Sequence, residues 1–253
     1  MLYLIGTGLT DYDISYSGVD ICRKCELLYY ESYTSNLIDK KVKILSDLFG
    51  KKIEKLERSD LEEKLISLVN KSIDKDVALL INGDPLIATT HKIVIIEAIK
   101  KGVKFKVIHS NSIFSAAIGE SGLDFYRFGA ICTLARWSEH YKPVSFYNTI
   151  LNNYSKGLHS IILLDYDSNK NETIPLTDAI STLKEAENIY KGNLFNNKTK
   201  LIVINNLGSE NGKIFYINLD SIKNLKGLNT LILPGNLSDI ELEWIEKVYD
   251  NQK

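Results

Sequence analysis

Short apolar runs alternate with amphipathic segments along the first half of the chain. The runs are continuous, as in strands that are buried on both faces. They span Leu2–Ile5, Cys25–Tyr30, Val77–Ile81 and Val103–Ile108. Continuous apolar strands separated by helices predict a mostly parallel sheet with helices on both faces.

Two segments between these runs have the pattern of helices. Ser59-Asp60-Leu61-Glu62 fits a capping box at a helix start, and a second helix is expected after Thr89 and Thr90. The apolar stripe of the first helix consists of Leu61, Leu65, Leu68 and Val69. In the second helix, the residues expected to face inward are Ile93, Ile96 and Ile99.

The second half of the chain repeats this alternation less regularly. The strands expected here are Ser160–Leu164, Lys200–Ile204 and Leu231–Leu233, and the helices are Thr177–Tyr190 and Ser238–Tyr249. The glycine-containing segment Gly208–Tyr216 predicts a hairpin or a loop, so the second sheet is expected to be mixed. The polar segment Asp167–Thr173 predicts an exposed loop.

A domain boundary is expected between residues 110 and 125, where glycine, serine and aromatic residues cluster without periodicity. The sequence therefore predicts two α/β domains, an N-terminal one over residues 1–112 with a mostly parallel sheet and a C-terminal one over 113–253 with a mixed sheet.

Composition narrows the class of protein. The chain has 253 residues, of which 44% are hydrophobic and 25% charged, which excludes collagen-like and largely disordered chains. The 31 basic and 32 acidic residues nearly cancel, so no strong attraction of the whole chain to nucleic acid or anionic membranes is expected. Three cysteines disfavour a disulfide framework. No apolar run has membrane-span length and the first residues do not resemble a signal peptide, so a cytoplasmic location is expected.

The first strand ends in Gly6-Thr7-Gly8-Leu9-Thr10-Asp11. Two glycines there allow a close approach of backbone to a ligand, and Glu31 lies near the spacing of a ribose-binding acid in a dinucleotide fold. However, Asp11 replaces the third glycine of that fingerprint, and a carboxylate at the expected helix start would repel a pyrophosphate. Nicotinamide or flavin binding is disfavoured, and a tight strand exit without a ligand stays an alternative.

A stronger signal follows the buried strand Val77–Ile81, where Gly83-Asp84-Pro85 leads to a helix. Open α/β sheets bind ligands at the carboxyl ends of their strands. Asp84 is suited to accept hydrogen bonds from a ligand or to lie near a cation. The alternative is a turn in which Asp84 accepts hydrogen bonds from backbone amides, and spacing alone favours neither.

Cysteine, histidine and aromatic residues give weaker signals. Cys22 and Cys25 lie on one face at the end of a predicted helix, so core packing is favoured over zinc or redox chemistry. The histidines form no metal-ligand pattern, and two that flank strands are predicted to be structural, His109 and His159. The aromatic run Phe125-Tyr126-Arg127-Phe128 fits base stacking, a pocket wall or packing under the domain junction.

Several segments taken together resemble the diphthine synthase family, which belongs to the tetrapyrrole-methylase-like class of S-adenosylmethionine methyltransferases. The run Gly83-Asp84-Pro85-Leu86-Ile87-Ala88-Thr89-Thr90-His91 is the most specific. The others, in chain order, are Gly6-Thr7-Gly8-Leu9, Glu31-Ser32-Tyr33-Thr34-Ser35, Asn111-Ser112-Ile113, Gly122-Leu123 with Tyr126 and Phe128-Gly129, Gly157-Leu158-His159, and Ile232-Leu233-Pro234-Gly235.

The resemblance implies a homodimer that holds its cofactor in the cleft between two α/β domains. It implies three successive methyl transfers to the amine of the 3-amino-3-carboxypropyl-histidine on translation elongation factor 2, giving diphthine in diphthamide biosynthesis. It assigns no catalytic residue and no metal. The cofactor contacts that it implies are Leu9, Asp84, Ile87, Ser112, Ile113, Leu164, Leu207 and Asn229.

The chemistry of S-adenosylmethionine agrees with the residues at the strand ends. The molecule is a sulfonium without phosphate, so Asp11 is no obstacle, and apolar side chains such as Leu9 are suited to pack on its rings. A protein substrate calls for an exposed rim, for which Tyr33, Arg127 and neighbouring lysines are candidates.

The chain departs from the family pattern at two places. Asn205-Asn206-Leu207-Gly208 stands where the family often has Ala-Arg-Ala-Gly, and Ser238 stands where it often has histidine. Two alternatives therefore stay open: a methyltransferase of the same class acting on a corrin-like ring or ribosomal RNA, and a non-catalytic S-adenosylmethionine-binding regulator of translation.

Overall fold

The computed structural model describes residues 1–31, 38–56, 61–167 and 172–249. The chain divides into two compact units. The first unit contains Met1–Ile113, and the second contains Phe114–Asp167 and the chain from Glu172 onward. Some expected features lie outside the described residues: the capping-box residues Ser59 and Asp60, the motif segment 32–35 with the rim residue Tyr33, and the burial of Leu61 and Leu65.

The first unit is built on a five-stranded sheet in which every described pairing is parallel, as predicted. Its strand order is β3-β2-β4-β1-β5. The central strands β1 and β4 pair in register from Leu2 beside Val77 to Gly6 beside Ile81. The strands are β1 (Leu2–Gly6), β2 (Leu27–Glu31), β3 (Glu54–Leu56), β4 (Val77–Ile81) and β5 (Phe105–Ile108).

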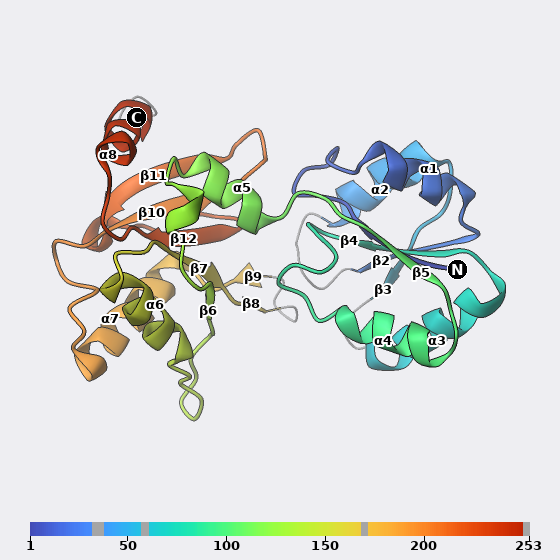
Figure 1. Cartoon of the computed structure of the whole chain (residues 1–253), viewed down its shortest axis with the longest axis horizontal. Coiled ribbons are helices and arrows are strands. Elements are labelled where there is room, and N and C mark those ends of the chain that lie inside the picture. The colour runs from blue at the N-terminus through green and yellow to red at the C-terminus, as the bar shows by residue number, and fades with distance from the viewer. Residues whose placement is uncertain (32–37, 57–60, 168–171, 250–253) are drawn as a thin grey trace. The chain divides into compact units, whose positions relative to one another are not determined.

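Helices cover both faces of this sheet (Figure 1). One face carries α1 (Tyr16–Lys24) and α2 (Ile38–Phe49), and the other carries α3 (Leu61–Asp74) and α4 (Lys92–Lys100). Because successive strand residues point to opposite faces, β4 supplies Leu80 to one core and Leu79 to the other. Two separate apolar cores therefore hold the strands in place.

The predicted inward face of α4 is wrong. Ile93, Ile96 and Ile99 are 63%, 51% and 61% exposed, whereas Val94 and Ala98 are buried. Apolar residues occupy most sides of this short helix, so spacing alone did not identify the face that packs. In α3 the predicted residues Leu68 and Val69 are buried.

The second unit contains a five-stranded mixed sheet in the order β11-β10-β12-β7-β6, as predicted. Only β6 and β7 pair in parallel; the other described pairings are antiparallel. The predicted hairpin joins β10 to β11. The strands are β6 (Cys132–Leu134), β7 (Ser160–Leu164), β10 (Lys200–Asn205), β11 (Lys213–Asn218) and β12 (Asn229–Leu233).

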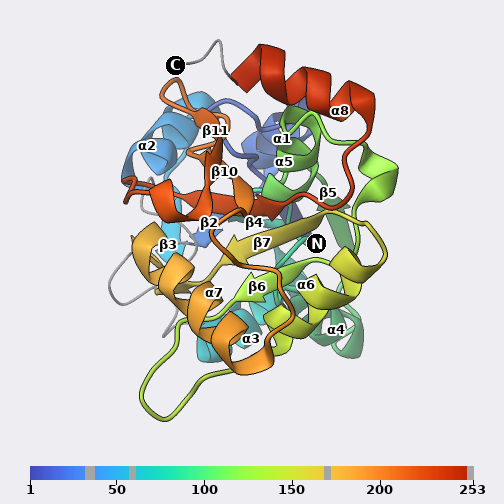
Figure 2. The same cartoon turned by 90° about the vertical axis from the view of Figure 1, so that its left-hand side faces the viewer.

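The helices of the second unit also lie on both faces of its sheet (Figure 2). One face carries α6 (Ser145–Ser155) and α7 (Leu176–Tyr190), and the other carries α5 (Ile113–Glu120) and α8 (Asp239–Trp244), which continues as a π-helical turn over Ile245–Tyr249. Of the segment predicted as an exposed loop, residues 168–171 lie outside the described residues, and its two ends are strand, since β8 (Tyr166–Asp167) pairs with β9 (Glu172–Thr173).

The cysteines pack in the cores, as predicted for the pair at α1. Cys22, Cys25 and Cys132 are buried free thiols, and burial raises the pKa of the Cys25 thiol to about 11. Thiols that stay protonated are poor nucleophiles. Among the helices of the described residues, none combines the length and the apolar character needed to cross a bilayer.

Candidate active site

Three neighbouring strands of the first unit end at one edge of its sheet, because β4, β1 and β5 are adjacent and parallel. The loop after β1 contains Leu9, the loop after β4 contains Asp84 and Ile87, and the loop after β5 contains Ser112. The topology therefore brings the predicted residues of this unit to the edge where open α/β sheets bind ligands.

The loops after β1 and β4 are joined by backbone hydrogen bonds between two glycines. Gly8 N–H donates to Gly83 O at 3.2 Å, and Gly83 N–H donates to Gly8 O at 3.0 Å. Both have positive φ, +67° and +71°. A Cβ on Gly8 would lie 2.1 Å from the Cβ of Asp13, whereas a Cβ on Gly83 would meet nothing closer than Asn111 O at 3.8 Å. A side chain is therefore excluded at Gly8, whereas a methyl group at Gly83 would make only ordinary van der Waals contact.

Asp13 fixes the loop after β1. Its Oδ2 accepts the backbone N–H of Leu9 at 3.0 Å and of Thr10 at 2.9 Å, and its Oδ1 accepts the Thr10 hydroxyl at 2.6 Å. Burial alone would raise the pKa of this carboxyl, but these hydrogen bonds hold it below its usual value. Leu9 is thus presented by a constrained turn.

The same turn corrects the expected place of Asp11. Helix α1 begins at Tyr16 after the N-cap Ser15, so Asp11 does not stand at a helix N-terminus. It lies in the loop, with Oδ2 3.0 Å from the ammonium of Lys40. The Asp13-bound turn lengthens the connection beyond what a dinucleotide fingerprint has.

Asp84 forms the turn that the sequence allowed. It is 5% exposed; its Oδ1 accepts Leu86 N–H at 2.9 Å, and its Oδ2 lies 2.8 Å from His109 Nδ1 and 3.3 Å from Ser110 N. The carboxylate thus joins the loops after β4 and β5. Beside it, the side chains of Ile87 and His109 are exposed.

Two buried charged residues that sequence analysis did not place at the site also hold this edge. Lys41 of α2 donates to Gly8 O and to Asn82 Oδ1. Glu31, considered above as a ribose ligand, lies with its Oε2 2.8 Å from His91 Nε2 in the interior. This pair ties the end of β2 to the Gly-Asp-Pro segment. Sequence analysis noted both Glu31 and His91, but no local signal showed that these two residues pair or that Lys41 lies at this edge.

The predicted residues of the second unit also lie along one sheet edge. In the antiparallel register Leu163 is opposite Thr230 and Asn205 is opposite Asn229, so the end of β7, the start of β12 and the end of β10 meet. Leu164 ends β7 and Leu207 follows β10. The Asn229 side chain accepts a hydrogen bond from Asn205 Nδ2 and donates to the carbonyls of Leu225 and Gly227, so its polar atoms are already bonded within the unit.

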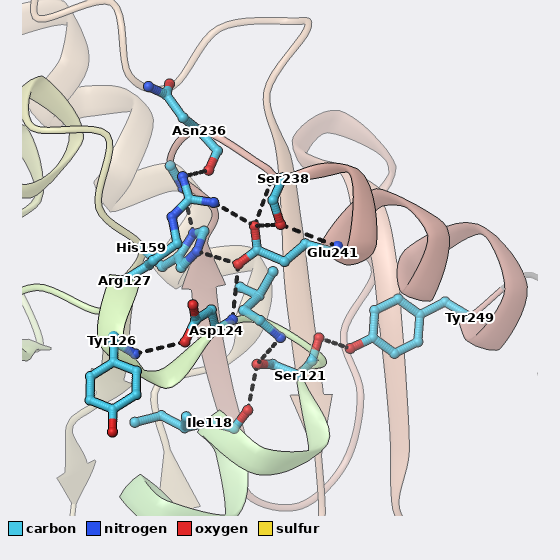
Figure 3. Close-up of polar contacts among 12 residues, drawn as sticks. Ile118, Ser121, Asp124, Tyr126, Arg127, His159, Asn236, Ser238, Glu241 and Tyr249 are labelled. Atoms are coloured by element: carbon cyan, nitrogen blue, oxygen red, sulfur yellow. Dashed lines mark hydrogen bonds and ion pairs between the residues drawn. The ribbon is translucent and has the colours of Figure 1, made fainter.

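His159 is structural, as predicted (Figure 3). It is fully buried; its Nε2 lies 3.0 Å from Glu241 Oε1, and its Nδ1 accepts Gly235 N–H at 2.9 Å. Glu241 also accepts hydrogen bonds from Asp124 N, Ser238 N and Arg127 Nη1. Burial by itself would raise the pKa of Glu241, but these bonds lower it to about 2.

This network changes the expectations for the nearby aromatic run. Arg127, expected on a recognition rim, is engaged by Glu241 and by Asn236 O. Phe125 and Tyr126 are exposed, so the prediction that this run packs is wrong for these two residues. Phe128 does pack, since its ring lies 5.3 Å from that of His159 between centroids. Within the described part of the chain, no three His, Cys, Asp or Glu side chains cluster as metal ligands.

Comparison with known proteins agrees with this architecture. A family model described as Tetrapyrrole (Corrin/Porphyrin) Methylases matches residues 1–223. A diphthine synthase from Methanothermobacter thermautotrophicus is 35% identical over 98% of this chain and 95% of that protein, and one from Methanocaldococcus jannaschii is 34% identical over 99% and 100%. A crystal structure of diphthine synthase superposes with a TM-score of 0.85 at 31% identity, covering 98% of this chain and 96% of the other.

The fold and the matches define the class: the protein is an S-adenosylmethionine-dependent methyltransferase with the tetrapyrrole methylase fold. The chain belongs to this family and, within it, to the diphthine synthases. The predicted resemblance and fold class are confirmed.

Proposed function

We propose that this protein methylates translation elongation factor 2 in diphthamide biosynthesis. The acceptor is the amine of its 3-amino-3-carboxypropyl-histidine, and three transfers give diphthine. The observation that carries the proposal is the likeness to diphthine synthases over nearly the whole chain. A translation factor as substrate requires a cytoplasmic enzyme.

The residues at the first unit's strand ends fit S-adenosylmethionine. Gly83 presents backbone without a side chain at this turn, where an added Cβ would clash with nothing, and the exposed side chain of Ile87 supplies apolar surface a few residues after Asp84. A cofactor without phosphate requires no anion site at a helix N-terminus. The residues that would hold the cofactor are Leu9, Asp84, Ile87, Ser112 and Ile113, with Leu164, Leu207 and the Asn229 backbone from the second unit.

When bound, the cofactor supplies an electrophilic methyl group on a sulfonium. The strand-end loops orient it and exclude water, which supplies much of the acceleration in a displacement with dispersed charge. The acceptor amine must arrive without its proton. Its pKa falls beside a positive charge, so the proposal needs no dedicated general base.

The test is methyl transfer to elongation factor 2 that carries the carboxypropyl-histidine, with isotopically labelled S-adenosylmethionine. Mass spectrometry of the modified peptide is expected to show the label on that histidine, in up to three additions. Cofactor binding without label on the peptide would support a non-catalytic regulator. Transfer to a corrin-like ring or ribosomal RNA instead would support the other alternative.

The homodimer remains a prediction from the family. Light scattering of the purified protein at several concentrations is expected to give twice the chain mass of 28.6 kDa. A constant mass of one chain would remove the dimer from the proposal and leave the methyl-transfer chemistry untouched.

A further inference from the structure

Lys41 is a charged residue in an unusual place for a lysine. Its side chain is 3% exposed, and lysine is almost never fully buried unless it is paired. Burial lowers its pKa to about 8, although Asp13 and Asp11 act in the opposite direction. The group is therefore mainly an ammonium at neutral pH, and specific contacts must offset the free-energy cost of burying its charge.

Those contacts are with the two loops that meet in front of β1 and β4. The ammonium donates to the carbonyl oxygen of Gly8 at 2.8 Å and to Oδ1 of Asn82 at 3.0 Å. The Gly8 carbonyl is the same atom that accepts Gly83 N–H. One buried cation from α2 thus joins both strand exits, at the point where the two glycines have positive φ.

We propose that Lys41 is a positioning residue of the methyltransferase: it fixes the loops after β1 and β4 in the arrangement that accepts the cofactor. This inference rests on the proposed function. Hydrogen bonds from a charged donor are stronger than neutral ones, and loops that are held before binding lose less entropy when the ligand arrives. Lys41 does not contact the reacting atoms in this proposal, so it acts on affinity rather than on the chemical step.

The chain offers a matched control. Lys40 precedes Lys41 in the same helix, but its side chain is 76% exposed and pairs with Asp11. Lys41→Met removes the donors and keeps an unbranched stem, whereas Lys40→Met removes a surface charge. Lys41→Arg keeps charge and donors, and Asn82→Ala removes one acceptor while the bond to Gly8 remains.

The experiment measures the dissociation constant of S-adenosylhomocysteine by calorimetry for these variants. Lys41→Met is expected to weaken binding about tenfold or more, Asn82→Ala less, and Lys40→Met not measurably. Lys41→Arg is expected to recover part of the loss. The Lys41→Met/Asn82→Ala double variant is expected to match Lys41→Met, because Lys41→Met already breaks the contact that Asn82→Ala removes.

Two further readouts separate positioning from a role in stability. Lys41→Met is expected to keep its melting temperature, because its removal relieves a buried charge, and to raise KM for S-adenosylmethionine with little change in kcat. If the wild-type protein fails to bind S-adenosylhomocysteine, the proposed function fails. Equal binding by wild type and Lys41→Met, or additive losses in the double variant, would overturn the inference about Lys41. Should Lys41→Met not fold, Asn82→Ala and Lys41→Arg decide, and unchanged affinity in both would overturn it.

Discussion

A buried carboxylate lies beside a histidine at the strand-end loops of the first unit and again beside α8 in the second unit, and these two pairs differ in what surrounds them. Asp84 lies 2.8 Å from His109, whose side chain is 67% exposed, and Glu241 lies 3.0 Å from His159, which is fully buried. The first pair joins the loops after β4 and β5, whereas the second is surrounded by Arg127 and by backbone N–H donors. Similar chemistry thus joins partly exposed loops in one unit, where the cofactor is proposed to bind, and a closed buried network in the other.

The largest expected effect separates these two roles. Glu241→Ala is expected to lower the free energy of unfolding by about 3–5 kcal/mol, because it leaves His159 and Arg127 without their buried acceptor. Asp84→Ala is expected to cost about 1–3 kcal/mol and to weaken S-adenosylhomocysteine binding. Urea unfolding and calorimetry measure both quantities. Unchanged cofactor affinity in Asp84→Ala would remove that residue from the proposed site.

Lowering the pH is expected to reduce the stability that the pair of Glu241 and His159 contributes. The folded-state pKa of Glu241 is about 2, below the usual 4.5, so its contribution of about 3 kcal/mol is present above pH 4.5 and is lost as pH falls toward 2. Burial also lowers the pKa of His159 below 6.5, so its contribution is lost on the acid side of 6.5. Unfolding measured from pH 7 to pH 3 is expected to show declining stability, with a smaller decline below pH 4.5 in Glu241→Gln. Equal declines in both proteins would contradict the role of Glu241.

Two glycines of the first unit, Gly8 and Gly83, are expected to respond differently to substitution by alanine. Gly8→Ala is expected to destabilise by about 2–4 kcal/mol, because strain at positive φ adds to a clash with Asp13. Gly83→Ala meets only the strain, about 1 kcal/mol, but places a methyl group where the cofactor is proposed to bind. Thermal unfolding and calorimetry are expected to show the larger stability loss at Gly8 and a loss of cofactor affinity at Gly83. Full affinity in Gly83→Ala would show that the cofactor does not use this space.

The smallest expected effect is at the helix start beside Glu241. Ser238 and Glu241 form a capping box for α8, so Ser238→Ala is expected to cost about 1 kcal/mol. Ser238→Thr, which keeps the hydroxyl, is the control and is expected to stay near wild type in urea unfolding. A loss as large as that of Glu241→Ala would mean that the cap, and not the ion pair, holds this helix.

Sequence patterns predicted the features that depend on local order. The buried strand Val77–Ile81 and the turn at Asp84 follow from a continuous apolar run and a Gly-Asp-Pro exit, and both are present. The prediction of the packed face of α4 was wrong, because a helix that is apolar on most sides has no preferred face until the neighbouring elements pack against it. Burial of Ala98 therefore required the fold.

Sequence analysis could not identify the partners of buried charged residues either, because the partners come from distant parts of the chain. Glu241 accepts a hydrogen bond from Asp124, 117 positions earlier, and Lys41 reaches Gly8 from another helix. Lys40 and Lys41 are identical residues side by side in sequence, and only the packing of α2 makes one a surface charge and the other a buried tie between loops.

The most direct test of the central claim is a crystal structure of the protein with S-adenosylhomocysteine. The account predicts ligand density at the carboxyl edge of the first unit's sheet, in the space before Gly83 and in contact with Leu9 and Ile87. Density at any other place, with this edge filled only by water, would contradict it.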